Sequence, residues 1–304
     1  MSLLGARHAL ELGAFIAFWG LVRALPHRGA RGTGAALGRL AHRLDARHRR
    51  VALENVAAAF PELSEDARRR LVRDCFRHFG GMVFDRLSMS RFDAEGICRR
   101  VSLEGWEHLL RAERQGTGLL LLTAHLGSWE MLGDPVSIYR GPSYAIARPA
   151  DNRYLDRRMR RLRERFGVIT VNRRGAGRRA LRALKSGERV WILADQRVHP
   201  REGVELPFLG RPATTSTLAA RLALRCGAPA VPIFCYPEPR GAFRIVVRAA
   251  IPPGGSGPAA VAELTARYVA ATEAEIRRHP EMWLWMHDRW RQRRRGGHQR
   301  EAGG

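Results

Sequence analysis

The amino-acid sequence predicts an α/β fold with a mixed, largely parallel central sheet flanked by helices. From Val101 onward, short apolar runs rich in β-forming residues alternate with helical patterns, which is typical of a parallel sheet covered by helices. The last two runs are separated only by the segment Pro237–Gly241, which indicates a hairpin and therefore one antiparallel pair of strands. With 304 residues, the chain can also bury a large core.

The N-terminal segment, residues 1–27, is predicted to be an apolar helix that associates with a membrane. Its apolar stretch Leu12–Val22 is shorter than the about 20 residues that a spanning helix needs. It also lacks the basic start and the cleavage site of a signal peptide. Trp19 and the basic cluster that begins at Arg23 favour an anchor that is interfacial or marginally inserted, and a core helix of a soluble protein is the alternative.

Two further helices are expected before the alternating region, over Arg47–Phe60 and Ser64–Ser88. Pro61 separates them, and acidic residues follow Ser64 as they do at helix starts. The expected strands are Leu119–Thr123, Tyr144–Ala147, Val168–Val171, Val190–Ala194, Ala230–Cys235 and Phe243–Val247. The helices expected between the first five strands are Ser128–Tyr139, Asn152–Phe166, Ala176–Lys185 and Ser216–Cys226.

A helix over Ala259–Arg278 and a Trp-rich segment near Pro280–Trp290 are expected to close the fold. We therefore predict one domain over residues 28–290. Residues 291–304 are predicted to be a basic disordered tail. The glycine-rich stretch Gly32–Gly38 faintly resembles a dinucleotide-binding loop, but it follows an Arg-rich coil where such a loop requires a strand.

The charge balance points to an anionic partner. The 53 basic residues outnumber the 29 acidic ones and give a formal net charge of +24, nearly all from arginine, since Lys185 is the only lysine. Nucleic acid, anionic lipid headgroups, phosphorylated substrates and an acidic carrier protein all fit such a balance. No recognised nucleic-acid module is present, so a basic nucleic-acid-binding protein is the remote alternative.

The segment TAHLGSWE, which starts at Thr123, carries the strongest chemical signal. His125 comes directly after a run that suits a strand buried on both faces, and open α/β sheets place their ligands at that edge. Gly127 supplies a turn after which Glu130 can approach the imidazole, fix its tautomer and raise its basicity. The alternative is a satisfied loop histidine and a glutamate that the helix dipole favours.

No metal or cofactor is expected. The chain contains no GxSxG, HExxH, Walker or DxDxDG motif, and its four cysteines show no metal-ligand spacing.

The order of motifs resembles that of the bacterial lipid A late acyltransferases, the lauroyl and myristoyl transferases of the lysophospholipid acyltransferase superfamily. The motifs are RRVALENVAAAFPELSEDARRRLVRDCFRHFG at Arg49, VSLEGWEHLL at Val101, TAHLGSWE at Thr123, ARPADNRYLDRRMRRLRERFG at Ala147, LKSGERVWILADQ at Leu184, LPFLGRPATTSTLAARLA at Leu206 and PEMWLWMHDRW at Pro280. The chain departs from the family pattern at Ser128, where Asn is usual, and at Asp85, where Glu is frequent.

The resemblance implies transfer of a fatty acyl chain from a thioester to a hydroxyl of a lipid A precursor, a step of lipopolysaccharide biosynthesis at the cytoplasmic face of the inner membrane. The implied donor is acyl carrier protein, with acyl-CoA open, and the acceptor is an anionic glycolipid. A related acceptor, such as phosphatidylinositol mannoside or an aminolipid, is the alternative.

The residues suit that chemistry. A hydroxyl is a poor nucleophile and needs a base, whereas a thiolate leaves easily. His125 is therefore the expected base and Glu130 its orienting partner. Arg148, placed by the family motif after the second strand, is the candidate to stabilise the oxyanion or to hold the acceptor, with a phosphate contact or a structural salt bridge as alternatives.

Five residues are candidates for binding substrate. Asp195 and Gln196 follow a buried run and should emerge at the same sheet edge as His125, where they could bind the acceptor, brace Arg148 or form a structural turn. Asn152 begins a helix and could be only its cap. Thr215 lies in a run of hydroxyl residues that we expect to start a later helix. With Arg211 nearby, it could form an anion site, and helix capping is the alternative.

The C-terminal tryptophans have two interpretations. Trp283, Trp285 and Trp290 are accompanied by arginines from Arg289 onward, a pairing that suits a membrane interface. Packing of the tryptophans into the core is the alternative.

Overall fold

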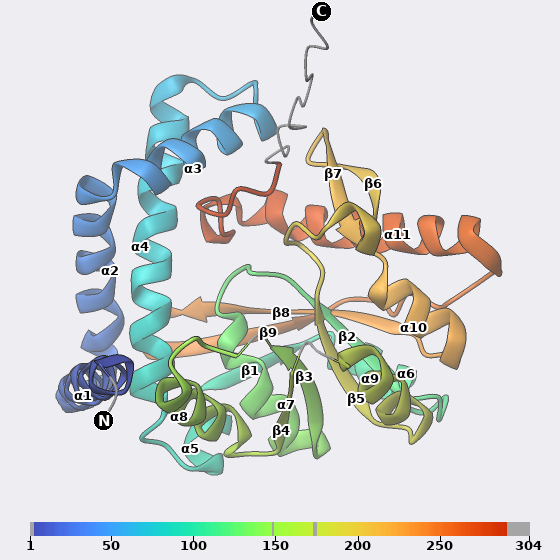
Figure 1. Ribbon diagram of the computed structural model, residues 1–304, viewed down its shortest axis with the longest axis horizontal. Helices are drawn as coiled ribbons and strands as arrows, with labels where there is room; N and C mark the ends of the chain where they lie inside the picture. The colour runs from blue at the N-terminus through green and yellow to red at the C-terminus, as the bar shows by residue number, and fades with distance from the viewer. Residues whose placement is uncertain (1–2, 148, 173–174, 291–304) are drawn as a thin grey trace, which may run out of the picture.

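The computed structural model describes residues 3–147, 149–172 and 175–290. A seven-stranded sheet in the order β1-β9-β8-β2-β5-β3-β4 forms its centre (Figure 1). These strands are β1 (Val101–Glu104), β2 (Leu119–Thr123), β3 (Ser143–Ala147), β4 (Val168–Asn172), β5 (Arg189–Leu193), β8 (Ala230–Glu238) and β9 (Ala242–Val247). The run from β8 to β4 is parallel, whereas β9 is antiparallel to β8. The predicted mixed, largely parallel sheet and its hairpin are confirmed.

The strand β2 shows why the sheet needs helices on both faces. All five of its residues are buried. Leu119 and Leu121 join the core beneath α5 (Ala94–Cys98), α6 (Trp106–Glu113) and α7 (Gly133–Arg140). Leu120 and Leu122 face the opposite core, beneath α9 (Ala176–Lys185), α10 (Leu218–Cys226) and α11 (Gly257–Arg278). Burying each leucine contributes about 1.5–3 kcal/mol, so this run stabilises both layers.

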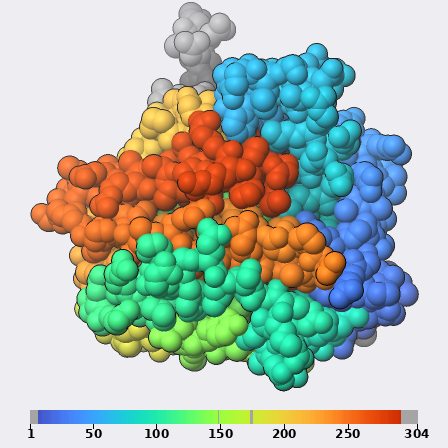
Figure 2. Space-filling model, turned by 180° about the vertical axis from the view of Figure 1, so that it is seen from behind, coloured from blue at the N-terminus to red at the C-terminus, as the bar shows by residue number. Residues whose placement is uncertain are grey.

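The first four helices stand together at one end of the molecule (Figures 1 and 2). They are α1 (Leu3–Ala24), α2 (His27–Leu44), α3 (Ala46–Ala59) and α4 (Glu65–Met89). The helices α3 and α4 follow the prediction, and the Ser64 hydroxyl accepts a hydrogen bond from the Ala67 amide as a helix cap (3.3 Å).

The helix α2 corrects the interpretation of residues 32–38 as following a coil. Two of its glycines, Gly34 and Gly38, lie where α2 crosses α4 with backbone against backbone. A Cβ on Gly34 would lie 2.4 Å from the Gly80 carbonyl oxygen, and one on Gly38 would lie 2.2 Å from that of Phe76. A glycine costs about 1 kcal/mol in a helix interior, so packing against α4 overrides the local preference.

The helix α1 packs on one side only. Trp19 and Val22 are buried against α4 and the helix α8 (Arg153–Glu164), whereas Leu10 and Leu21 are 76% and 70% exposed. In the part of the chain that the structure describes, every helix is too short or too polar to cross a bilayer. Association of this segment with a membrane surface stays a prediction.

A separate hairpin corrects the expected start of a later helix. The strands β6 (Gly203–Phe208) and β7 (Arg211–Ser216) pair antiparallel, with Thr215 opposite Val204. The run of hydroxyl residues therefore belongs mainly to a strand, which suits β-branched threonines. The helix α10 begins only at Leu218, with Thr217 as its N-cap residue.

The C-terminal tryptophans are core residues. Trp283, Trp285 and Trp290 are 1%, 0% and 8% exposed and pack with residues of α3 and α4. The membrane-interface interpretation is wrong for these three side chains. The arginines after residue 290 and the expected tail, residues 291–304, lie outside the described residues.

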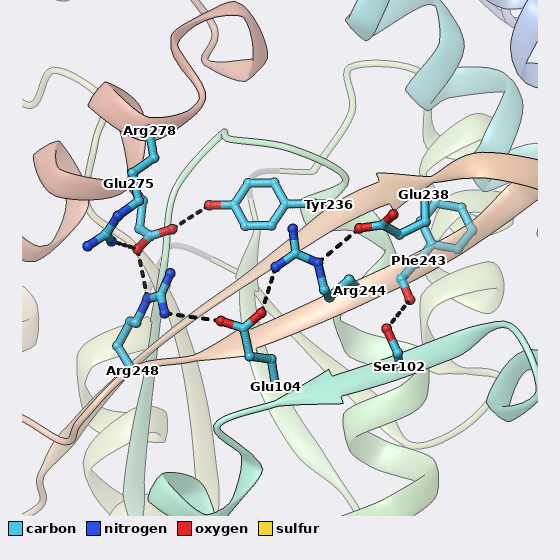
Figure 3. Close-up of polar contacts among 9 residues, drawn as sticks. All are labelled: Ser102, Glu104, Tyr236, Glu238, Phe243, Arg244, Arg248, Glu275 and Arg278. Carbon is cyan, nitrogen blue, oxygen red and sulfur yellow. Dashed lines mark hydrogen bonds and ion pairs between the residues drawn. The ribbon is translucent and has the colours of Figure 1, made fainter.

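A network of ion pairs ties the β1 edge of the sheet to α11 (Figure 3). Glu275 of α11 accepts hydrogen bonds from Tyr236 (2.7 Å) and Arg248 (2.8 Å), and it also pairs with Arg278. Glu104 of β1 binds Arg244 (2.6 Å) and Arg248 (3.3 Å). Each arginine of this network therefore has a carboxylate partner. From behind, α11 lies across the molecule (Figure 2).

Candidate active site

The turn after β2 is fixed along its backbone. The His125 amide donates to Asp195 Oδ2 (2.9 Å), and the Ser128 amide donates to the Cys235 carbonyl (2.7 Å). Gly127 has φ +63°, and a Cβ there would lie 2.2 Å from the Cys235 carbonyl oxygen, so only glycine fits. The turn therefore holds His125 in one position.

Two segments that are distant in sequence also bind this turn. The Gly127 amide donates to Met282, and the Leu284 amide donates to the His125 carbonyl (3.0 and 3.1 Å). From α4, His78 Nε2 donates to the Gly127 carbonyl (3.0 Å). Burial, aided by the nearby Arg31 charge, lowers the pKa of His78 to about 4, so this histidine is neutral at pH 7.

Asp195 is the hydrogen-bond partner of the His125 side chain. Its Oδ1 lies 2.9 Å from His125 Nδ1, and its Oδ2 accepts a further bond from Trp283 Nε1 (2.9 Å). Burial opposes ionisation, but the charge and hydrogen bonds of His125, with help from Trp283, lower the pKa of Asp195 to about 2. The ionised carboxylate therefore holds the proton on Nδ1 and leaves Nε2 as an acceptor. Gln196 Nε2 lies 3.2 Å from that nitrogen.

Strand register explains this pairing. Thr123 of β2 lies opposite Leu193 of β5 in the parallel ladder. Two residues beyond each of these positions, the chain delivers His125 and Asp195 to the same edge. The sequence predicted the shared edge, but it gave no register.

Glu130 acts on His125 by its charge. Its carboxylate forms a two-pronged ion pair with Arg163 of α8 (2.7 and 3.2 Å), so the expected place of Glu130 beside the imidazole is taken by Asp195. Burial raises the pKa of Glu130, but the charge and hydrogen bonds of Arg163 outweigh it and lower that pKa below its ordinary value. Burial likewise lowers the pKa of His125, yet the Asp195 and Glu130 charges raise it above its usual value. The imidazole is therefore a strengthened base.

A cavity of about 710 Å³ opens beside His125. Part of its lining is apolar and comes from the sheet and from the segment that leads into α7: Leu132, Ala145, Val168 and Trp191. A buried ion pair between Arg86 and Asp134 (2.5 Å) also reaches this cavity.

A second part of the cavity wall is basic. It comes from the loop after β5, the short helix η2 (Pro200–Glu202) and the start of α10. It includes Arg197, Arg201 and Arg221, together with the hydroxyl residues Ser216 and Thr217.

The other predicted site residues are spread out. Gln196 lines the cavity, whereas Asn152 is buried and caps α8 by accepting hydrogen bonds from the amides of Tyr154 and Leu155 (3.0 and 3.2 Å). Its amide group also donates to Glu11 of α1 (2.9 Å). Both features favour the capping alternative.

Arg211 and Thr215 are not among the described residues that line the cavity. The Arg211 guanidinium lies 5.2 Å from the centre of the Trp290 ring, and the buried Thr215 hydroxyl accepts a hydrogen bond from Arg289 (2.6 Å). Arg148 lies outside the described residues, so its role stays a prediction.

Sequence reasoning missed two contacts of the site. The sequence predicts Trp283 only as a membrane-interface or core residue, yet its indole donates a hydrogen bond to Asp195. Arg163 lies in the expected helix Asn152–Phe166 but was not among the candidate site residues, yet it binds Glu130. Neither contact has a local signal, because the partners are far apart in sequence.

Known proteins are similar in sequence to this chain over most of its length. A family model described as bacterial lipid A biosynthesis acyltransferase matches residues 5–292. A lipid A biosynthesis lauroyltransferase of Escherichia coli (strain K12) is 30% identical, with 97% of this chain and 95% of the relative covered. A palmitoleoyltransferase of the same pathway and strain is 27% identical, with coverages of 86% and 84%. A phosphatidylinositol mannoside acyltransferase of Mycolicibacterium smegmatis is 25% identical, with coverages of 92% and 91%.

Proposed function

The chain belongs to the bacterial lipid A biosynthesis acyltransferase family, and from this we propose that it transfers a fatty acyl chain from a thioester to a hydroxyl of a lipid A precursor. The hydrogen bond between His125 and Asp195 at the cavity edge carries this proposal. It supplies an oriented base beside a space that can hold both substrates.

In the proposed mechanism, His125 Nε2 takes the proton of the acceptor hydroxyl as its oxygen attacks the thioester carbonyl. A C–O bond forms, and the carbonyl becomes a tetrahedral oxyanion. The C–S bond then breaks, and the leaving thiolate takes up the proton from the imidazolium. Asp195 stabilises the imidazolium directly, and Glu130 adds a second negative charge nearby. A positioned base of this kind contributes about 10²–10⁴ to the rate.

The oxyanion needs a donor. Arg148 is the proposed one, or else it holds the acceptor. The apolar lining formed by Leu132, Ala145, Val168 and Trp191 suits the acyl chain of the donor.

Acyl carrier protein is the proposed donor, because an acidic carrier complements a chain of net charge +24. The proposed location is the cytoplasmic face of the inner membrane. The exposed side chains Leu10, Ile16 and Leu21 of α1, with Arg23 at its end, suit an interfacial helix on anionic lipid. Flotation with anionic liposomes tests this location, and failure to float would contradict it.

A phosphatidylinositol mannoside is the second candidate acceptor, because the relative of that name matches 92% of this chain. The same base and thioester donor would serve either hydroxyl. Lipid mass spectrometry of a deletion strain and of the complemented strain separates the two acceptors, because only the true product loses and regains one acyl mass.

The direct test uses membranes that contain the wild-type chain, acyl carrier protein thioester and an underacylated lipid A precursor. His125→Ala should lower the transfer rate by about 10²–10⁴. His108→Ala is the matched control, because His108 is partly exposed and is not among the described residues that line the cavity. Undiminished transfer by His125→Ala would refute the mechanism.

A further inference from the structure

We propose that Arg201 and Arg221 form a subsite for a phosphate group of a substrate, on the basic wall of the cavity. This inference deepens the proposed function and rests on it.

Several arginines at the cavity and at the β1 edge have carboxylate partners, whereas the buried Arg289 binds the Thr214 carbonyl and the Thr215 hydroxyl instead. In the cavity itself, Arg163 binds Glu130 and Arg86 binds Asp134. At the β1 edge of the sheet, the arginines of Figure 3 are shared among three glutamates: Glu104, Glu238 and Glu275. Such pairing offsets the cost of withdrawing a charge from water.

Arg201 and Arg221 are, by contrast, exposed side chains on the cavity wall. Both line the cavity, and within the described chain neither lies within ion-pair distance of a carboxylate. The described part of their wall holds three arginines, with Arg197, against one carboxylate, Glu202. The wall therefore has an excess of positive charge beside the proposed base.

Local structure brings the two side chains to one place. The short helix η2 presents Arg201, and the first turn of α10 presents Arg221. A backbone hydrogen bond from the Thr217 amide to the Glu202 carbonyl (3.4 Å) joins the two elements. Arg221 Nε donates to the Thr217 hydroxyl (3.1 Å), which orients the guanidinium. Among the described residues, its two terminal nitrogens have no hydrogen-bond partner, so they can bind a ligand.

The same wall is connected to the base. The loop that carries Gln196, whose amide nitrogen is 3.2 Å from His125 Nε2, continues through Arg197 into η2. A substrate anchored by Arg201 and Arg221 would thus be held at a fixed place relative to the imidazole.

Phosphate is the ligand that this chemistry favours. Guanidinium groups bind phosphate through two parallel hydrogen bonds, and a dianion relieves the repulsion between two adjacent cations. The hydroxyls of Ser216 and Thr217 offer further donors on the same wall. The phosphate could belong to a glycolipid acceptor or to the phosphopantetheine arm of the donor.

A binding experiment tests the subsite without acyl transfer. The full chain is titrated with N-acetylglucosamine 1-phosphate and, separately, with N-acetylglucosamine. We expect only the phosphorylated sugar to bind, and Arg201→Gln and Arg221→Gln each to raise its Kd about tenfold, since a hydrogen bond to a charged group is lost. Equal binding of both sugars, or an unchanged Kd in the double variant, would overturn the proposal.

The matched control is Arg225→Gln. Arg225 is exposed on α10 one turn after Arg221, and it is not among the described residues of the cavity lining. Its replacement removes the same charge and should leave the Kd unchanged. Equal losses in Arg221→Gln and Arg225→Gln would show that net charge alone attracts the sugar, which would also overturn the subsite.

Steady-state kinetics separate the two sources of phosphate. If the acceptor supplies it, the double variant should raise KM at least tenfold for a phosphorylated acceptor and leave KM for a dephosphorylated acceptor unchanged. If the donor supplies it, KM should rise for the carrier-protein thioester and not for an acyl thioester that lacks phosphate. Unchanged KM for both substrates would refute the subsite. Sugar phosphate binding by a wild-type chain that transfers no acyl group would refute the proposed function alone.

Discussion

The two sides of the cavity differ in how their polar groups are satisfied. Around His125, the imidazole, the Asp195 carboxylate and the backbone of the turn all bind other parts of the protein. On the basic wall, Arg201 and Arg221 lack carboxylate partners within the described residues. The contrast indicates that the two sides have different roles, one in the reaction and one in binding. A group that must react is held in advance, whereas a group that must bind stays hydrated until its ligand arrives.

The largest test of this contrast removes the charge that holds His125. We expect Asp195→Asn to lower kcat about 10³-fold, because an amide beside Nδ1 favours the wrong tautomer and no longer stabilises the imidazolium. Single-turnover acyl transfer measures the effect. Asp66→Asn, on the first turn of α4, is the control and should leave kcat unchanged. A value of kcat near that of the wild type in Asp195→Asn would assign Asp195 a purely structural role.

A smaller effect is expected for Glu130→Gln, which removes a charge but no hydrogen bond to the imidazole. His125 acts as a base only when neutral, so kcat/KM should fall as the pH drops through its raised pKa. Glu130→Gln removes one cause of that rise. The acidic limb should therefore move to lower pH, and the rate above it should fall about tenfold or less. A pH profile from 5 to 9 measures both changes, and a limb that moves upward would contradict the assignment.

Trp283→Phe tests the hydrogen bond by which Trp283 holds Asp195, the partner of His125. It deletes the hydrogen bond to Asp195 Oδ2 while keeping an aromatic ring, so kcat should fall about five- to tenfold. Trp285→Phe is the matched control, because Trp285 Nε1 donates to the Pro280 carbonyl instead (2.6 Å). Both variants should lose similar thermal stability. Equal kcat losses in the two would mean that core packing alone explains the effect.

The smallest effect is expected in the ion-pair network of Figure 3. Arg244 is about one-third exposed, so Arg244→Gln should cost only about 0.5–1 kcal/mol of the free energy of unfolding. It should leave every KM unchanged, because its partners Glu104 and Glu238 are structural. Arg221→Gln should do the reverse, with a raised KM and an unchanged midpoint of thermal unfolding. Chemical denaturation and steady-state kinetics on both variants check these opposite effects on stability and on KM.

Much of the fold could be predicted because burial leaves a local pattern. The strand Leu119–Thr123 and the helix Ala176–Lys185 have the expected bounds. The strand is a continuous apolar run because both of its faces are buried, and the helix repeats apolar residues at helical spacing on its buried face. The helix α2 was missed because its glycines look unfavourable until α4 packs on them. The strand β1 was missed because its four residues alternate in burial and, within the described residues, pair with β9 alone.

The site was only half predictable for a similar reason. Strand ends placed His125 and Asp195 at one edge, but their contact depends on a ladder between residues about 70 positions apart. Spacing within a single motif favoured Glu130 instead. The motif that ends in Trp283 showed only that the segment is apolar, and its hydrogen bond to Asp195 is a product of tertiary structure.

Because Trp283 donates a hydrogen bond to Asp195, the position of Trp283 in the sequence determines when during synthesis this support of the site can form. Trp283 follows Asp195 by 88 residues, which takes roughly 4–18 s to translate at about 5–20 residues per second. During that interval the nascent chain carries His125 and Asp195 without the indole that holds the carboxylate. The hydrogen bond that supports Asp195 can therefore form only after Trp283 has been made, and a chain that stops earlier carries His125 and Asp195 but lacks the indole.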